Sequence, residues 1–181
     1  MAFPPPPHSK LTIFPSLPPA NAVNFAQGVP ATVTQTTGCS IILFSPDLQI
    51  VASFDNSGSE VTSEFQTSIS HGFTFSSTQS VSITSSVEVS IEVVKVGVST
   101  TFSLSFTEEW NTTTTKTITF SCPPKSKAFV YQGTLKSQIM VFNPADGSYS
   151  YSGAAAQALT QALVSRNAPI TPPTLSLTAA A

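Results

Sequence analysis

One stretch of the chain alternates apolar and polar residues for far longer than an ordinary strand. From Val61 to Val93 the apolar or bulky residues fall at odd positions, with hydroxyls and carboxylates between them. From Val94 to Phe120 they fall at even positions. Strict alternation is typical of β-strands, because successive side chains point to opposite faces. The sequence therefore predicts an all-β fold.

The single change of phase predicts one long hairpin. In a hairpin with an even-numbered turn, facing residues have an odd index sum and share a face, which is what the alternation requires. One register gives the opposite pairs Val81–Phe106, Ile83–Leu104, Val89–Val98, Ile91–Val96 and Glu92–Lys95. A turn through 94–97 satisfies the same parity. The pattern thus predicts which residues share a face and leaves the register open.

The length of this hairpin needs an explanation. Each arm, roughly 30 residues at ~3.3 Å per residue, would span on the order of 100 Å. Strands in globular domains usually contain about 3 to 10 residues. Either the arms fold into several shorter strands in the soluble protein, or they straighten in another state, and both can hold for one chain.

The middle of the hairpin, residues 80–106, has the length and pattern of a membrane-crossing ribbon. Its arms exceed the ~9 to 11 residues that a tilted strand needs to cross a bilayer. In a closed barrel one face meets lipid and the other lines the lumen. Two arms cannot close a barrel, so several copies are required. The predicted lipid-facing residues are Val81, Ile83, Val87, Val89, Ile91, Val96, Val98, Phe102 and Leu104.

The charged residues of the ribbon fall on the other face. Glu88, Glu92 and Lys95 are predicted to face the lumen, with one net negative charge per chain and a mild preference for cations. Two other interpretations stay open. The charges can be solvated strand residues, and the ribbon can be an amphipathic hairpin that covers a sheet without entering a membrane.

Composition excludes several classes of protein. The 181 residues include 28 Ser and 24 Thr but only 9% charged residues, so hydroxyls replace charges as the solubilising groups. The net charge of −2 and the absence of a basic patch argue against a nucleic-acid partner. No GxSxG, HExxH, P-loop or GxGxxG motif is present, and carboxylates are sparse, so we predict no enzyme and no cofactor.

Cysteine and histidine usage is minimal. Cys39 and Cys122 are either two buried thiols or one disulfide. His8 and His71 are far apart and have no metal-ligand spacing. A proline tract near the start leaves no visible secretion signal, and no apolar run is long enough for a membrane helix. We expect a protein made in soluble form, released or secreted, and then inserted into a target membrane.

The flanking regions divide the chain into three parts. Residues 1–24 form a Pro-rich arm, residues 25–153 a β domain, and residues 154–181 an Ala- and Pro-rich tail. In the β domain, "CSIILF" and "LQIVASF" read as strands separated by an "SPD" turn, and "KAFVYQGTLKSQIMVFN" as two strands with a turn or bulge near Gly133. The segment "AAAQALTQALVS", at the start of the tail, is a short helix candidate.

The stretch "FSLSFTEEWNTTTTKTITFSCPPKSKAFVYQG" resembles the pore-forming module of the aerolysin and epsilon-toxin family. The shared features are a Ser/Thr-rich amphipathic segment, an aromatic-Asn-Thr stretch, a hydroxyl-rich strand and a "PP" before the next strand, over roughly residues 60–143. The resemblance implies an elongated, twisted antiparallel sheet and a monomer that binds a membrane, forms a ring often of seven subunits, and inserts its hairpin. The family has no catalytic residues.

Target recognition and activation are open at this stage. The chain has no obvious separate receptor-binding domain, which leaves open what it recognises. A lipid and a glycan are both candidate receptors. Arg166 either marks a cleavable C-terminal propeptide or is a plain exposed residue. The alternative function is a non-enzymatic lectin-like or structural β module. The aromatic residues that would line the ligand surface of such a module, or the membrane rim of a pore, are Trp110, Tyr131, Tyr149 and Tyr151. Trp110 also fits a core position.

Overall fold

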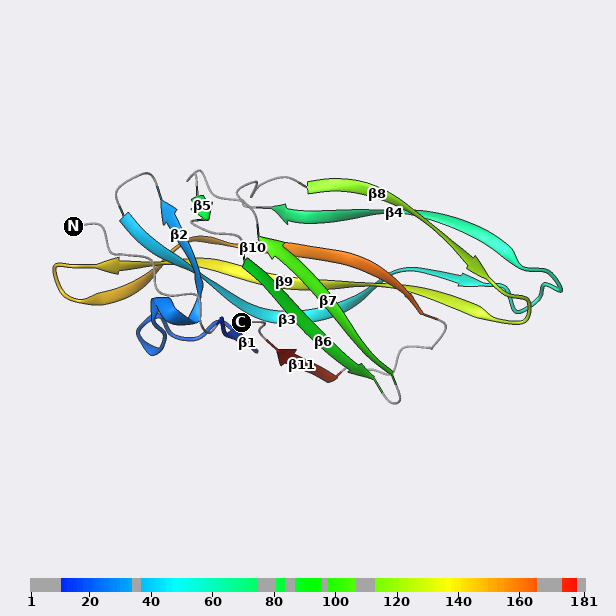
Figure 1. Cartoon of the computed structure of the whole chain (residues 1–181), viewed down its shortest axis with the longest axis horizontal. Coiled ribbons are helices and arrows are strands. Elements are labelled where there is room, and N and C mark those ends of the chain that lie inside the picture. The colour runs from blue at the N-terminus through cyan, green and yellow to red at the C-terminus, as the bar shows by residue number, and fades with distance from the viewer. Residues whose placement is uncertain are drawn as a thin grey trace.

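The computed structural model describes residues 11–33, 37–74, 81–83, 87–95, 98–106, 113–165 and 174–178. The molecule is elongated and mainly β, with one eight-stranded sheet and one three-stranded sheet (Figure 1). Within those ranges the helical elements are two short 3-10 turns, η1 (Ala20–Ala22) and η2 (Phe25–Gln27). The all-β prediction is confirmed.

The main sheet forms the long body of the molecule. Its strand order is β5-β2-β3-β9-β10-β4-β8, and neighbours along this path are antiparallel. A short additional strand, β1, pairs with β3 in parallel. The strands are β1 (Ile13–Phe14), β2 (Val29–Val33), β3 (Thr37–Asp55), β4 (Ser63–Thr74), β5 (Val81–Ile83), β8 (Thr113–Cys122), β9 (Lys127–Asn143) and β10 (Ser148–Ser165).

Two long strands replace two predicted strand pairs. The "SPD" segment is a bulge inside the 19-residue β3, where Ser45 has φ 49 and the register shifts between Phe44 and Asp47. Gly133 lies inside the 17-residue β9. The bulges next to it belong to the neighbours β3 and β10. The turn residues are thus absorbed as extra residues beside a regular central strand.

The helix prediction for residues 154–165 is wrong. This segment is the second half of β10 and pairs with β9, from Ala156 opposite Ser137 to Ser165 opposite Phe129. β10 therefore continues through the predicted boundary at residue 153, and the division into arm, domain and tail stays a prediction. The helix propensity of Ala is small, and pairing with a long central strand overrides it.

The body has a different core at each end. At one end β4 and β8 form a second layer over β3, β9 and β10, with Phe54, Phe65 and Phe120 between them. The ring of Phe54 lies 4.1 Å from that of Phe65 and 5.0 Å from that of Phe120. At the other end the N-terminal segment packs Val23 against Ile42 and Met140. Cys39 and Cys122 are buried thiols and form no disulfide.

Candidate functional site

The alternating stretch folds as two separate antiparallel ribbons. Strands β4 and β8 form what we call the base ribbon, which belongs to the main sheet. Strands β6 (Val87–Lys95) and β7 (Val98–Phe106) form the distal ribbon, which belongs to the three-stranded sheet. In Figure 1 the distal ribbon crosses the long strands of the body diagonally. The arms are therefore divided into shorter strands, which is the first of the two alternatives that the sequence left open.

The base ribbon has an unbroken register and two different faces. Ten consecutive pairs run from Ser63 opposite Cys122 to Gly72 opposite Thr113. On the inner face Ile69 and Phe120 are buried. On the outer face Ser68 and Thr117 are exposed, and their hydroxyls lie 3.4 Å apart. The apolar face thus packs on the body while a hydroxyl face meets solvent.

A buried asparagine fixes the outer end of the base ribbon. Asn56, 5% exposed, donates from Nδ2 to the carbonyls of Val61, Cys122 and Pro123, each at 2.9 Å. Its Oδ1 accepts a hydrogen bond from Ser63. These bonds join the turn between β3 and β4 to the turn between β8 and β9. Because the bond to the carbonyl of Cys122 is buried, losing its donor would leave that carbonyl desolvated.

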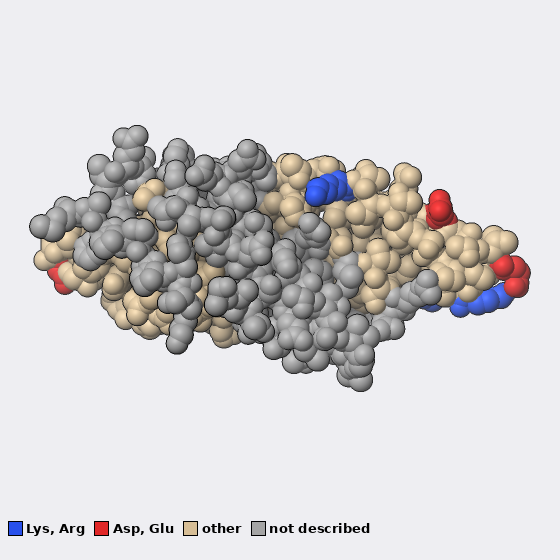
Figure 2. Space-filling view, viewed as in Figure 1, with Lys and Arg blue, Asp and Glu red and all other residues tan. Residues whose placement is uncertain are grey.

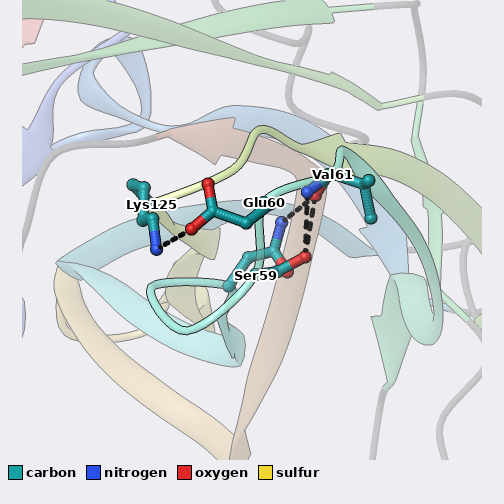
Figure 3. Close-up of polar contacts among 5 residues, drawn as sticks. Ser59, Glu60, Val61 and Lys125 are labelled. Carbon is teal, nitrogen blue, oxygen red and sulfur yellow. Dashed lines mark hydrogen bonds and ion pairs between the residues drawn. The ribbon is translucent and has the colours of Figure 1, made fainter.

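Charged side chains gather at this same end (Figure 2). Figure 3 shows Lys125 reaching Glu60, with 2.6 Å between Nζ and Oε1, beside Ser59 bonded to Val61. Lys127 contacts Asp55, also at 2.6 Å. The hydrogen bond from Lys127, and then those from Ser57, hold the pKa of Asp55 well below its usual range. All four side chains of the ion pairs are more than half exposed.

The distal ribbon confirms the predicted parity and corrects the register. Its pairs run from Val87 opposite Phe106 to Lys95 opposite Val98, and every index sum is odd. The hairpin connection therefore falls at residues 96–97, three positions beyond the register first considered. Val89 faces Leu104 and Glu92 faces Thr101, so the expected pairs Val89–Val98 and Glu92–Lys95 are not formed. Val96 lies outside the described residues.

The corrected register changes the expected place of Lys95. Lys95 is the last residue of β6 and is opposite Val98. Since alternate residues of a strand share a face, Lys95 belongs to the set of Val89 and Ile91, whereas Glu92 belongs to the other set. The two glutamates of β6 are therefore separated from the lysine by the pattern of the strand. The adjacent valines at positions 93 and 94 allowed both registers in the sequence.

Two residues predicted for the hairpin lie elsewhere. Val81 and Ile83 belong to β5, which pairs with β2 at the edge of the main sheet. Val81 is opposite Val33, and Ile83 is opposite Ala31. The first arm thus runs from β4 at one side of the sheet to β5 at the other before entering β6. Three residue pairs attach this arm to the body.

A C-terminal strand covers the outer edge of β6. Strand β11 (Thr174–Thr178) pairs with β6 from Thr174 opposite Val94 to Thr178 opposite Ser90. The resulting order is β11-β6-β7, and β7 lies next to β10. Sequence reasoning placed residues 174–178 in a tail. The alternation of "TLSLT" was the signal for a strand, but five residues do not indicate a partner.

The candidate ligand aromatics are not gathered on one surface. Tyr131 is 5% exposed on β9, opposite Leu163. Tyr149 and Tyr151 are half-buried on the early part of β10, where they pack with the N-terminal segment, and the Tyr151 hydroxyl donates to the carbonyl of Pro18 at 2.8 Å. Trp110 lies outside the described residues. Tyr149 and Tyr151 therefore lie together, and Tyr131 belongs to another part of the sheet.

The described ranges contain neither a metal-binding cluster nor a long apolar helix. Within them, no three His, Cys, Asp or Glu side chains come together as a group able to hold a metal ion. The same residues include no helix with the length and hydropathy needed to cross a membrane.

Comparison with known proteins gives one structural neighbour to report. No family model and no curated protein matches the chain. Among solved structures, the Mpp75Aa1.1 beta-pore-forming protein from Brevibacillus laterosporus is similar with a TM-score of 0.20 and 12% sequence identity, over 81% of this chain and 69% of that one. A likeness this low identifies no family for the chain.

Proposed function

We propose that this protein forms membrane pores by oligomerisation, with each subunit contributing the distal ribbon to a transmembrane β-barrel. The proposed assembly is a homo-oligomeric ring of about seven copies, formed after a released, soluble monomer binds a lipid or glycan on its target membrane. The chain acts mechanically and carries out no catalysis. The apolar set of the ribbon faces lipid, and the set that contains Glu88 and Glu92 faces the lumen.

The observation that carries the proposal is the shared parity of the two ribbons. In both, odd positions of the first arm pair with even positions of the second. The buried set of the base ribbon, which includes Ile69 and Phe120, is therefore in phase with Val89 and Leu104 of the distal ribbon. A strand that continued through both ribbons would keep Ile69 and Phe120 on the same face as Val89 and Leu104.

The segments between the ribbons permit such a continuation. The first arm has fourteen residues, 73–86, between the last pair of the base ribbon and the first pair of the distal ribbon; the second arm has six, 107–112. Because the difference of eight is even, the two registers can merge without exchanging faces. Residues 81–83 of the longer segment form β5, so part of this segment is paired with β2 in the soluble fold.

Conversion requires the loss of two attachments. The three pairs between β5 and β2 and the five pairs between β11 and β6 must open. Opening the second exposes an edge of β6 that can pair with a neighbouring subunit, since a barrel leaves no edge unpaired. Arg166 lies between β10 and β11, so cleavage there would separate β11 from the body covalently. Transfer of the apolar set into lipid offsets the lost pairs.

The direct test is dye release from liposomes made with extracted target-cell lipids, run beside gels that detect detergent-resistant oligomers. Val89→Lys should abolish release, because a lysine on the lipid face costs about 2 to 4 kcal/mol per subunit at the bilayer midplane. Ser90→Lys is the matched control, since Ser90 is the next residue and belongs to the other set. Equal release by both variants contradicts the proposal.

A second test fixes the ribbon in its soluble position. Leu175→Cys with Val93→Cys places two thiols at paired positions of β11 and β6. The oxidised protein should bind liposomes without releasing dye, and reductant should restore release. Each single-cysteine variant controls for the substitutions. Release by the oxidised double variant would mean that β11 does not restrain the ribbon.

A further inference from the structure

The chain passes from the base ribbon toward the distal ribbon through one junction, at residues 70–74. Gly72 is paired on both sides, with Thr113 of β8 and Leu159 of β10. Before this residue β4 pairs with β8, and after it with β10. Gly72 has φ +130, a conformation that residues with a side chain rarely adopt. At this junction β4 thus changes its partner from β8 to β10.

Side chains of two other strands hold this junction. The hydroxyl of Thr114 donates to the carbonyl of His71 at 3.3 Å. The amide of Gln132, a buried residue of β9, donates to the carbonyl of Ser70. Both bonds end on the backbone of β4 immediately before Gly72. Loosening β4 here would therefore free the start of the segment that leads to β5 and β6.

His71 is placed beside a positive charge at this point. It is half-buried and lies opposite Thr114, so Lys116, two residues further along β8, is its diagonal neighbour on the same face. Diagonal neighbours of an antiparallel pair are ~7 to 8 Å apart, within the reach of a lysine. Burial, and secondarily Lys116, lower the pKa of His71 below its usual value of 6.5.

The described neighbouring strands offer no nearby carboxylate to a protonated His71. Glu64 belongs to the opposite, exposed face of β4, and β10 contains no charged residue. On β3, Asp55 is paired with Lys127 and Asp47 is exposed, and no carboxylate contributes to the pKa shift of His71. The remaining charged residues of β9 are Lys127 and Lys136. Protonation would thus place a cation on the half-buried His71, beside the exposed Lys116.

We infer that His71 makes this junction acid-sensitive, so that protonation weakens the attachment of β4 to β8 at the point where the distal segment begins. The direction follows from linkage: a histidine that is harder to protonate in the folded state stabilises that state less as the pH falls below 6.5. The junction is intact at neutral pH and loosens in mild acid. As a trigger for ribbon release, the device rests on the proposed function, but its effect on the junction does not.

The test measures hydrogen exchange of the amides at residues 72–74 at pH 7.5 and 5.5, after correction for intrinsic rates. Protection should fall about two- to five-fold at pH 5.5, the range expected for one like-charge pair across strands. His71→Gln should remove the change, and Lys116→Gln should reduce it. His8→Gln, which changes the other histidine of the chain, should leave the response intact. An unchanged response in His71→Gln, or no response in the wild type, overturns the inference.

A spectroscopic measurement gives an independent check. In His8→Gln the imidazole of His71 is the only one in the chain, so its proton resonance reports a single titration. The midpoint should lie below 6.5 and should rise in the His8→Gln, Lys116→Gln double variant; a midpoint at or above 6.5 contradicts the inference. Both measurements use protein without membranes. Failure of dye release with a positive exchange result would reject pore formation alone.

Discussion

The base and distal ribbons come from one alternating stretch, yet they are attached to the molecule in different ways. The base ribbon belongs to the main sheet, packs on Phe54 and Val130 of the body, and is fixed by Asn56. The distal ribbon belongs to a separate sheet, and its outer edge is paired with the short strand β11. The same residue pattern thus occurs once as a layer packed on the main sheet and once as a ribbon of a separate sheet. The difference lies in what surrounds each ribbon.

The largest expected effect is on the aromatic core below the base ribbon. Phe120→Ala should lower the free energy of unfolding by about 3 to 5 kcal/mol, because it leaves a cavity beside Phe54 and Phe65. Thr119→Ala, on the exposed face of the same strand, should change it by less than about 0.5 kcal/mol. Urea denaturation measures both. Similar values would mean that the base ribbon is not anchored by its apolar face.

Asn56 provides the second-largest expected effect. Asn56→Ala should cost about 2 to 3 kcal/mol, because the buried carbonyl of Cys122 loses its donor and the hydroxyl of Ser63 loses its acceptor. The carbonyls of Val61 and Pro123 lose one of two donors each. Asn56→Asp should cost more at neutral pH, since a carboxylate would face those carbonyls without a donor. Asn143→Ala, at an exposed turn, is the control. Equal unfolding midpoints for the aspartate and alanine variants would contradict this account of the hydrogen bonds.

The boundary between the two ribbons can be tested at Gly72. Gly72→Ala should cost about 1 to 2 kcal/mol, because its φ of +130 is strained for any residue with a Cβ. Gly58→Ala is the matched control: nothing lies within 4 Å of an added Cβ there. Thermal unfolding of the two variants makes the comparison. If Gly72→Ala is as stable as the wild type, the junction does not depend on this backbone conformation.

Sequence reasoning predicted the features that depend on local pattern. Alternation from Val61 to Phe120 gave the β class and the parity of both ribbons, because side chains in a strand have a strict period of two. The exact register was not determined, since Val93 and Val94 are adjacent and allow the hairpin connection to move by a few residues. Parity is a property of the pattern, whereas register depends on the turn and its neighbours.

The remaining features depend on contacts between distant segments. Pairing of Val81 with Val33, and of Leu177 with Ile91, joins strands too short to identify their partners. A turn was expected at Ser45, and a turn or bulge near Gly133, but the first segment lies within β3 and the second within β9. The Ala-rich segment after residue 153 is a strand because it pairs with the edge of β9 that β3 leaves unpaired. None of these outcomes is visible in a local window.

The two ribbons also differ in how their charges should act. If the distal ribbon lines a pore, Glu88→Gln and Glu92→Gln should each lower cation preference, while Lys95→Gln should change it little, because Lys95 belongs to the other set of positions. A few-fold change in permeability ratio corresponds to about 1 kcal/mol or less. Reversal potentials across planar bilayers provide the measurement. A larger shift for the lysine variant would favour the register first considered.

The smallest expected effect concerns the ion pairs at the outer end of the base ribbon. Lys125 and Glu60 are in contact but largely exposed, so solvent screening should leave their coupling below about 1 kcal/mol. A double-mutant cycle with Lys125→Ala and Glu60→Ala, followed by urea denaturation, measures that coupling without counting the loss of either side chain. A coupling free energy larger than the cost of Asn56→Ala would mean that the ion pairs, and not the hydrogen bonds of Asn56, fix this end of the base ribbon. The base ribbon would then be released by salt, and its contrast with the distal ribbon would depend on ionic strength.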